Sequence, residues 1–221
     1  MSWESTLDYY RIINEEMRKK LGSLHSAKIL LYSFDFQQIE ILQHNNNWDQ
    51  LTSDLIQKAK CLEAGGADFL LICTNTMHIM ADAIQDSLQI PLLNIVDVTA
   101  EAIKSEKITK ICLLGTRFTM EKDFYKGRLS DIHTLEVSIP GKEDRDIVHD
   151  IIYNELCKGV ISGQSKTAIM QIIQKMIAQG CEGIVLGCTE LPMIIKQDDI
   201  AVPVFDTTTI HAHAAVKKAL S

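Results

Sequence analysis

The stretch GADFLLICTNTMH, residues 66–78, passes from a glycine turn through an apolar, strand-like run into a cluster of small polar side chains. The stretch GCEGIVLGCTELP, residues 180–192, repeats this layout at an offset of 114 residues (180 − 66 = 114). Self-similarity at a fixed offset indicates a duplicated architecture. Carried forward without a gap, the offset pairs Thr74 with Cys188, Asn75 with Thr189, and Thr76 with Glu190.

Short aliphatic runs alternate with longer amphipathic stretches along the chain. This pattern predicts an α/β fold, in which helices cover a parallel sheet. We expect strands at residues 28–34, 68–73, 90–96, 110–115, 134–139, 183–188 and 202–206. We expect helices at residues 48–64, 120–129, 144–158 and 166–179, each ending near a glycine or a polar turn.

The repeat predicts two similar lobes, which we place at residues 1–97 with 208–221 and at residues 98–207. In the second copy, the apolar run 110–115 precedes a hydroxyl-rich turn, whereas the matching turn of the first copy has nothing before Met1. The first strand of the first lobe is therefore expected to be absent. Two facing lobes would form a cleft, in which strand ends and helix N-termini favour an anion.

Composition narrows the class of partner. The 221 residues are 46% hydrophobic and 23% charged, as in a globular protein, and the net charge of −7 argues against a nucleic-acid partner. We see no apolar run of membrane-spanning length and no leader, so we expect a cytoplasmic protein. The six cysteines lack paired CxxC spacing and are interpreted as free thiols. His78, His211 and His213 lack a partnering ligand set, so we expect no metal site.

The motifs CTNTMH (73–78) and GCTELP (187–192) resemble the two signatures of the cofactor-independent aspartate/glutamate racemase family. The opening MSWESTLDYY also resembles the first loop and helix of that family, which normally follow a strand. The resemblance covers almost the whole chain. It implies two Rossmann-like lobes related by a pseudo-twofold axis, with the active site in the cleft between them. It also implies a homodimer without pyridoxal phosphate or another cofactor, in which one cysteine per lobe exchanges the α-proton of an amino acid.

The first motif departs from the family pattern at the position that matters most. The family has a cysteine directly before Asn-Thr, where this chain has Thr74, and Cys73 lies one residue earlier. Adjacent residues of a regular strand point to opposite faces, so only one of the two can face the substrate. We expect Cys188 and Thr74 to be the catalytic pair, with Cys73 as the alternative to Thr74. If Thr74 is not catalytic, it caps the following helix.

The remaining site residues are expected to hold the substrate. Glu190 either orients Thr189 or contacts the substrate amine, and otherwise is an exposed acid. The hydroxyls of Ser2 and Thr116 either contact a carboxylate or act as helix N-caps. Gln43 belongs to a polar loop that is a lid, a reader of the side-chain carboxylate of the substrate, or plain surface. The expected substrate-binding residues are Met1, Ser2, Gln43, Asn75, Thr76, Thr116, Thr189 and Glu190.

These observations predict an amino-acid racemase that acts on aspartate or glutamate. A thiol suits proton transfer near neutral pH, because its reference pKa of about 8.5 can be tuned by neighbouring groups. Two alternatives stay open: a related cysteine-dependent isomerase of the maleate or hydantoin type, and a non-catalytic protein of the same fold that binds an amino acid or anion.

Overall fold

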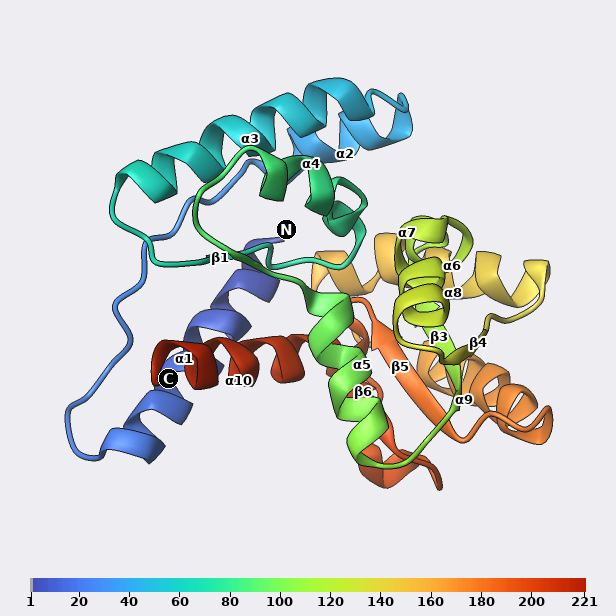
Figure 1. Ribbon diagram of the computed structural model, residues 1–221. Coiled ribbons are helices and arrows are strands. Elements are labelled where there is room, and N and C mark those ends of the chain that lie inside the picture. The colour runs from blue at the N-terminus through green and yellow to red at the C-terminus, as the bar shows by residue number, and fades with distance from the viewer. Residues whose placement is uncertain (1) are drawn as a thin grey trace. The chain divides into compact units, whose positions relative to one another are not determined.

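The computed structural model describes residues 2–221, coloured along the chain in Figure 1. The polypeptide divides into two compact units. Unit 1 is the chain up to Asn94 together with Ala212–Ser221, and unit 2 is Ile95–His211. Each unit combines helices with a parallel sheet, so the predicted α/β class is confirmed.

Unit 1 is mainly helical. Its two short strands, β1 (Leu70–Leu71) and β2 (Leu92–Leu93), pair in parallel with Leu70 opposite Leu92. Its helical elements are α1 (Trp3–Leu21), α2 (Phe36–His44), α3 (Trp48–Ala64), η1 (Thr76–Met80), α4 (Ala81–Asp86) and the end of α10 (Thr207–Ala219).

Helix α3 shows why this part of the sequence packs as it does. Leu51, Leu55 and Ala59 recur every four residues, which places them on one face of the helix, and all three are buried. They share a core cluster with Leu70 and Ile72. Helices α2 and α3 run side by side (Figure 1).

The strand predicted at residues 28–34 is wrong: this segment has no regular secondary structure. Several of its apolar side chains stay exposed, among them Leu30 and Leu31. A cavity of about 1160 Å³ lies beside it, bordered by α1, α3 and residues 67–72. A strand requires a hydrogen-bonded neighbour. Residues 28–34 pair with neither β1 nor β2.

Unit 2 contains a larger sheet with the strand order β4-β3-β5-β6, all parallel. The strands are β3 (Lys110–Gly115), β4 (Glu136–Ser138), β5 (Gly183–Gly187) and β6 (Val204–Asp206). The helical elements are α5 (Ile95–Ser105), α6 (Arg117–Glu121), α7 (Asp123–Gly127), η2 (Arg128–Ile132), α8 (Lys142–Asn154), η3 (Leu156–Lys158), α9 (Gly163–Ala178), η4 (Leu191–Met193) and η5 (Gln197–Asp199), followed by the start of α10.

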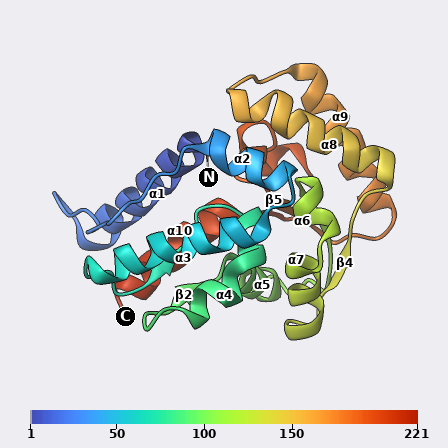
Figure 2. The same cartoon turned by 90° about the horizontal axis from the view of Figure 1, so that it is seen from above.

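Side chains of the central strands alternate between two cores, as the period of a strand requires. On β3, Cys112 and Leu114 face the core formed with α8 and α9, whereas Ile111 and Leu113 face the core formed with α5. Helices α8 and α9 lie side by side in Figure 2. A sheet covered on both faces accounts for the continuous apolar runs of its central strands.

The internal repeat is visible in the backbone. Helix α3 leads through Gly66, with φ 93°, into β1, and helix α9 leads through Gly180, with φ 90°, into β5. Positive φ is the left-handed conformation that glycine adopts without strain, which accounts for a glycine at both turns. Within the described residues, no helix is both long and apolar enough to cross a membrane.

Candidate active site

Polar side chains gather where the two central strands of unit 2 end. Strand β3 ends at Gly115 and strand β5 ends at Gly187, and these two glycines are paired in the sheet register. Thr116 follows the first strand, and Cys188 follows the second. Because parallel strands end at the same edge of a sheet, Thr116 and Cys188 come from neighbouring positions of that edge.

The carboxylate of Glu190 joins the residues of the second motif. Its Oε2 atom accepts a hydrogen bond from Sγ of Cys188 at 2.9 Å and another from Oγ1 of Thr189 at 2.8 Å. Cys188 and Glu190 are each 6% exposed and Thr189 is 7% exposed, so this is a buried cluster. Glu190 is therefore not an exposed acid, and its hydrogen bond to Thr189 is the contact that an orienting role requires.

Cys188 is a thiol rather than a thiolate in this environment. Burial raises the pKa of Cys188 well above its usual value, and the nearby charge of Glu190 raises it further. The half-buried Cys157 on η3 acts in the same direction. A thiol that donates to a carboxylate holds its proton between two groups that can exchange it.

Thr116 begins α6, and a second threonine adjoins it. The hydroxyl of Thr116 accepts a hydrogen bond from the backbone N–H of Thr119 at 3.3 Å, so Thr116 is an N-cap. The hydroxyls of the two threonines are also 3.3 Å apart. Thr119 is fully buried and packs over Gly115 and Gly187. Sequence analysis did not select it, although the hydroxyl spacing of GTRFT was a usable signal.

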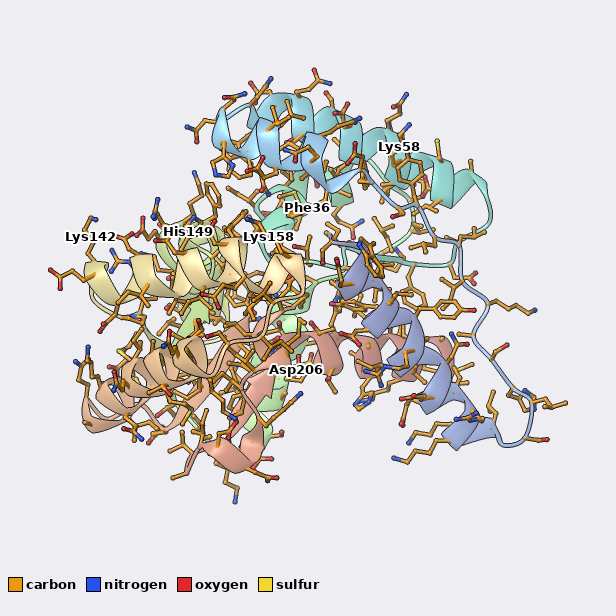
Figure 3. All side chains as sticks on the ribbon, turned by 180° about the vertical axis from the view of Figure 1, so that it is seen from behind. Phe36, Lys58, Lys142, His149, Lys158 and Asp206 are labelled. Carbon is orange, nitrogen blue, oxygen red and sulfur yellow. The ribbon has the colours of Figure 1, made fainter. Side chains whose placement is uncertain are left out.

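The end of β6 contributes further hydroxyls that sequence analysis did not select. Asp206, labelled in Figure 3, accepts a hydrogen bond from the backbone N–H of Thr208 at 3.0 Å and caps α10. The hydroxyl of Thr207 donates to the carbonyl of Leu186 on β5 at 2.9 Å. The run DTTT directly after a strand was the signal for these residues.

Unit 1 brings together most of the residues predicted from the first motif. Ser2 caps α1 by accepting a hydrogen bond from the backbone N–H of Ser5 at 3.2 Å. The hydroxyl of Ser5 in turn donates to the carbonyl of Cys73 at 3.3 Å, which ties the start of α1 to the chain after β1. Asn75 and Thr76 are buried at the start of η1.

Gln43 is buried rather than part of a surface loop. It lies in the last turn of α2, and its Nε2 atom is 3.9 Å from Sδ of Met77. Met1, also predicted to contact substrate, lies outside the described residues.

Cys73 and Thr74 are both half-buried. The backbone N–H of Thr74 donates to the carbonyl of Ile72 at 2.8 Å, and the carbonyl of Thr74 is 2.8 Å from Nδ1 of His78. The ring of His78 thus braces the turn that carries Thr74. Burial raises the pKa of Cys73 to about 11, so its thiol is protonated at neutral pH.

Among residues 2–221, no group of three or more His, Cys, Asp or Glu side chains could hold a metal ion.

The chain matches known proteins along most of its length. The family model for Asp/Glu/hydantoin racemases matches residues 1–215. The broad-specificity amino-acid racemase RacX of Bacillus subtilis is 24% identical over 180 residues, which are 78% of this chain and 74% of RacX.

Solved structures agree with this match. A Yersinia pestis protein proposed to be an Asp/Glu racemase has a TM-score of 0.94 and 50% identity, covering 100% of this chain and 96% of its own. An aspartate racemase homologue from Pyrococcus horikoshii has a TM-score of 0.85 and 36% identity, covering 99% and 95% respectively. The chain belongs to the Asp/Glu/hydantoin racemase family, whose racemases are isomerases.

Proposed function

We propose that this protein is a racemase for aspartate or glutamate that works without a cofactor. The observation that carries the proposal is the buried cluster of Cys188, Thr189 and Glu190 at the carboxyl end of β5. A buried thiol hydrogen-bonded to a carboxylate is suited to moving a proton, and racemisation consists of removing and returning one proton.

The α-proton of an amino acid is weakly acidic, so it has to be taken by a positioned base and returned by a positioned acid on the other face. We assign one of these roles to Cys188. We assign the other to Thr74, which the internal repeat matches with Cys188, and keep Cys73 as the alternative. Burial raises the pKa of Cys73 to about 11 and raises the pKa of Cys188 as well, so this shift does not decide between Cys73 and Thr74.

Hydrogen-bond donors around these groups would hold the substrate carboxylates and stabilise charge that develops during proton removal. Amide and hydroxyl groups are suited to this task, because each can donate a hydrogen bond. The residues that we assign to substrate binding are Met1, Ser2, Gln43, Asn75, Thr76, Thr116 and Thr189.

Exchange of the α-proton in heavy water tests the proposal. D- and L-aspartate and D- and L-glutamate are incubated with the protein, and loss of the α-proton signal is followed by NMR. Cys188→Ser should lower exchange by at least about 100-fold, as expected for loss of a general acid or base. Cys61→Ser is the matched control, because Cys61 is exposed on α3, and it should exchange like the wild type.

Other outcomes separate this function from its alternatives. Binding of these amino acids without exchange would identify a binding protein. Exchange that survives Cys188→Ser would contradict the assigned role of Cys188. We also propose that the enzyme is a homodimer and that it is located in the cytoplasm. Sedimentation tests the oligomeric state, and cell fractionation tests the location.

A further inference from the structure

The cavity of unit 1 is larger than a small ligand requires. Its volume of about 1160 Å³ lies above the range of about 300–1,000 Å³ that is usual for small-molecule pockets. Two continuous stretches of chain line it, residues 25–34 and residues 65–73. Side chains of an extended chain alternate between two faces, so a cavity lined by every residue of a stretch runs along the edge of its backbone, where N–H and C=O groups point.

Helices border the same cavity. Leu55 and Ala59 of α3 line it, and so do Ile13 of α1 and Val216 of α10. Figure 1 shows α3 on one side of β1, and α1 with α10 on the other. A strand in the middle of a parallel sheet has this surrounding, because helices cover both of its faces and a neighbour lies along each edge.

The apolar segment between α1 and α2 has the side-chain alternation of a strand. The ring of Tyr32 lies 5.1 Å from Nζ of Lys58 on α3 and packs edge-on against Phe34, with ring centroids 4.8 Å apart. A Cβ atom on Gly65, which ends α3, would lie 3.1 Å from Cδ1 of Leu30. Leu30, Tyr32 and Phe34 therefore share one face, which is the period of two of an extended chain.

The two edges along the cavity have no partner strand within residues 2–221. Strand β1 pairs in parallel with β2, and no other described strand pairs with β1. Residues 28–34 belong to neither sheet, although the four consecutive apolar side chains from Ile29 to Tyr32 are 37% to 57% exposed. Single exposed apolar side chains are normal, but a continuous run indicates a surface that needs a partner.

Unit 2 shows what fills the corresponding place. The repeat matches Gly66 before β1 with Gly180 before β5. Strand β5 has β6 on one edge and β3 on the other, and β3 also pairs with β4. In chain order, β6 corresponds to β2, and β4 corresponds to residues 28–34. The counterpart of β3 is therefore the strand that the described part of unit 1 lacks.

We propose that the cavity of unit 1 binds one further β-strand, an extended apolar peptide that another polypeptide supplies. The peptide runs parallel to β1, with hydrogen bonds to β1 along one edge and to residues 28–34 along the other. This is strand addition to a sheet, in which main-chain hydrogen bonds give affinity and side-chain pockets give specificity. Both faces of the peptide become buried, so it has to be apolar at consecutive positions, as β3 is.

A six-residue peptide with the sequence of β3, Lys110–Gly115, is the probe. It carries a fluorophore, and its anisotropy is followed as the protein is titrated in under reducing conditions. A control peptide with Ile111→Ser and Leu113→Ser keeps only one apolar face. The control should bind at least about tenfold more weakly, because burial of each aliphatic side chain favours binding by at least about that factor.

Two variants of the protein distinguish the cavity from the rest of its surface. Leu31 lines the cavity and is 57% exposed, whereas Leu7 on α1 is 56% exposed and does not line it. Neither side chain belongs to the core, so both variants should fold. Leu31→Lys should weaken binding of the probe by at least about tenfold, because the peptide would bury the new charge. Leu7→Lys should bind like the wild type.

Hydrogen exchange shows where the probe lies. Backbone amides of residues 28–34 and of β1 should exchange at least about tenfold more slowly with the probe bound, because they gain hydrogen-bond partners. Amides of unit 2 should not change. No amino-acid substrate enters these measurements, so their outcome is independent of the proposed racemase function.

Several results would overturn the proposal. They are absence of binding, equal binding of the two peptides or to the Leu31→Lys variant, and binding that leaves exchange at residues 28–34 unchanged. An apolar dye that binds where neither peptide does would make the cavity a small-molecule site. Self-association that the probe reverses would assign the cavity to a second copy of this chain.

Discussion

Gly115 on β3 lies directly against Gly187 on β5, so closely that a Cβ atom on Gly115 would sit 2.8 Å from the carbonyl oxygen of Gly187. The contact brings the ends of the two central strands together. Thr116 and Cys188 follow these glycines directly, so they come from neighbouring strand ends.

We therefore expect Gly115→Ala to destabilise unit 2 by about 1–3 kcal/mol, the usual cost of overpacking a well-packed interior. The carbonyl belongs to the backbone and cannot move aside like a flexible side chain. Urea unfolding followed by circular dichroism measures the loss. Gly127→Ala is the control, because its Cβ atom would meet its nearest neighbour at 3.7 Å, an ordinary contact; an equal loss in both variants would contradict the explanation.

Cys73→Ala should affect stability rather than chemistry. The half-buried thiol contributes packing, and its removal should cost about 1 kcal/mol, as for loss of a methyl-sized group. The α-proton exchange rate per folded molecule should stay within about twofold of the wild type. If exchange vanished while the unfolding free energy stayed unchanged, Cys73 would take the role that we assign to Thr74.

Thr74→Cys should reduce the asymmetry between the two enantiomers. A threonine hydroxyl is much less acidic than a thiol, so Thr74 can donate a proton but is a poor base unless another group activates it. We expect the wild type to exchange the α-proton of one enantiomer readily and of the other slowly, and Thr74→Cys to accelerate the slow one.

Exchange rates for D- and L-aspartate and glutamate, measured for both proteins, check this prediction. The equilibrium constant stays at unity in each case, because the two enantiomers are mirror images. Equal wild-type rates on both enantiomers, or no gain in the variant, would remove the support for an asymmetric mechanism.

Asp97 at the start of α5 should make unit 2 sensitive to acid. Its carboxylate accepts from Nε and Nη2 of Arg128, each at 2.7 Å, and lies 2.8 Å from Nε2 of His133. Burial alone would raise the pKa of Asp97, but these two partners outweigh it and hold the pKa below the usual value. A lowered folded-state pKa adds stability above the unfolded value of about 3.9, and this stability is lost as the pH falls through the folded value.

Asp97→Asn should therefore lower the unfolding free energy near pH 7 by about 1–2 kcal/mol and flatten its decline below about pH 4. Thermal unfolding between pH 7 and pH 3 measures both effects. The control is Asp123→Asn, whose carboxylate is 90% exposed beside Lys126. An equally steep acid decline in Asp97→Asn and the wild type would show that another group is responsible.

The sequence by itself determined the features that depend on local chemistry and on the repeat. The turns at Gly66 and Gly180 could be predicted, because only glycine readily adopts positive φ between a helix and a strand. Strands β3 and β5 could be predicted from their continuous apolar runs, because a sheet covered on both faces buries every side chain of its central strands. Cys188 and Thr74 stood out because the repeat matched them, and their assigned roles stay predictions.

Only the tertiary structure decided the features that depend on partners distant in sequence or on side-chain direction. The apolar run at residues 28–34 has the composition of a strand, yet it forms none, since a strand exists only through hydrogen bonds to a neighbour. The sequence left three possibilities for Glu190: it orients Thr189, it contacts the substrate amine, or it is an exposed acid. Sequence spacing could not decide among them, because it does not say where a side chain points. The fold turned its carboxylate onto Cys188 and Thr189, where burial without these hydrogen bonds would be costly.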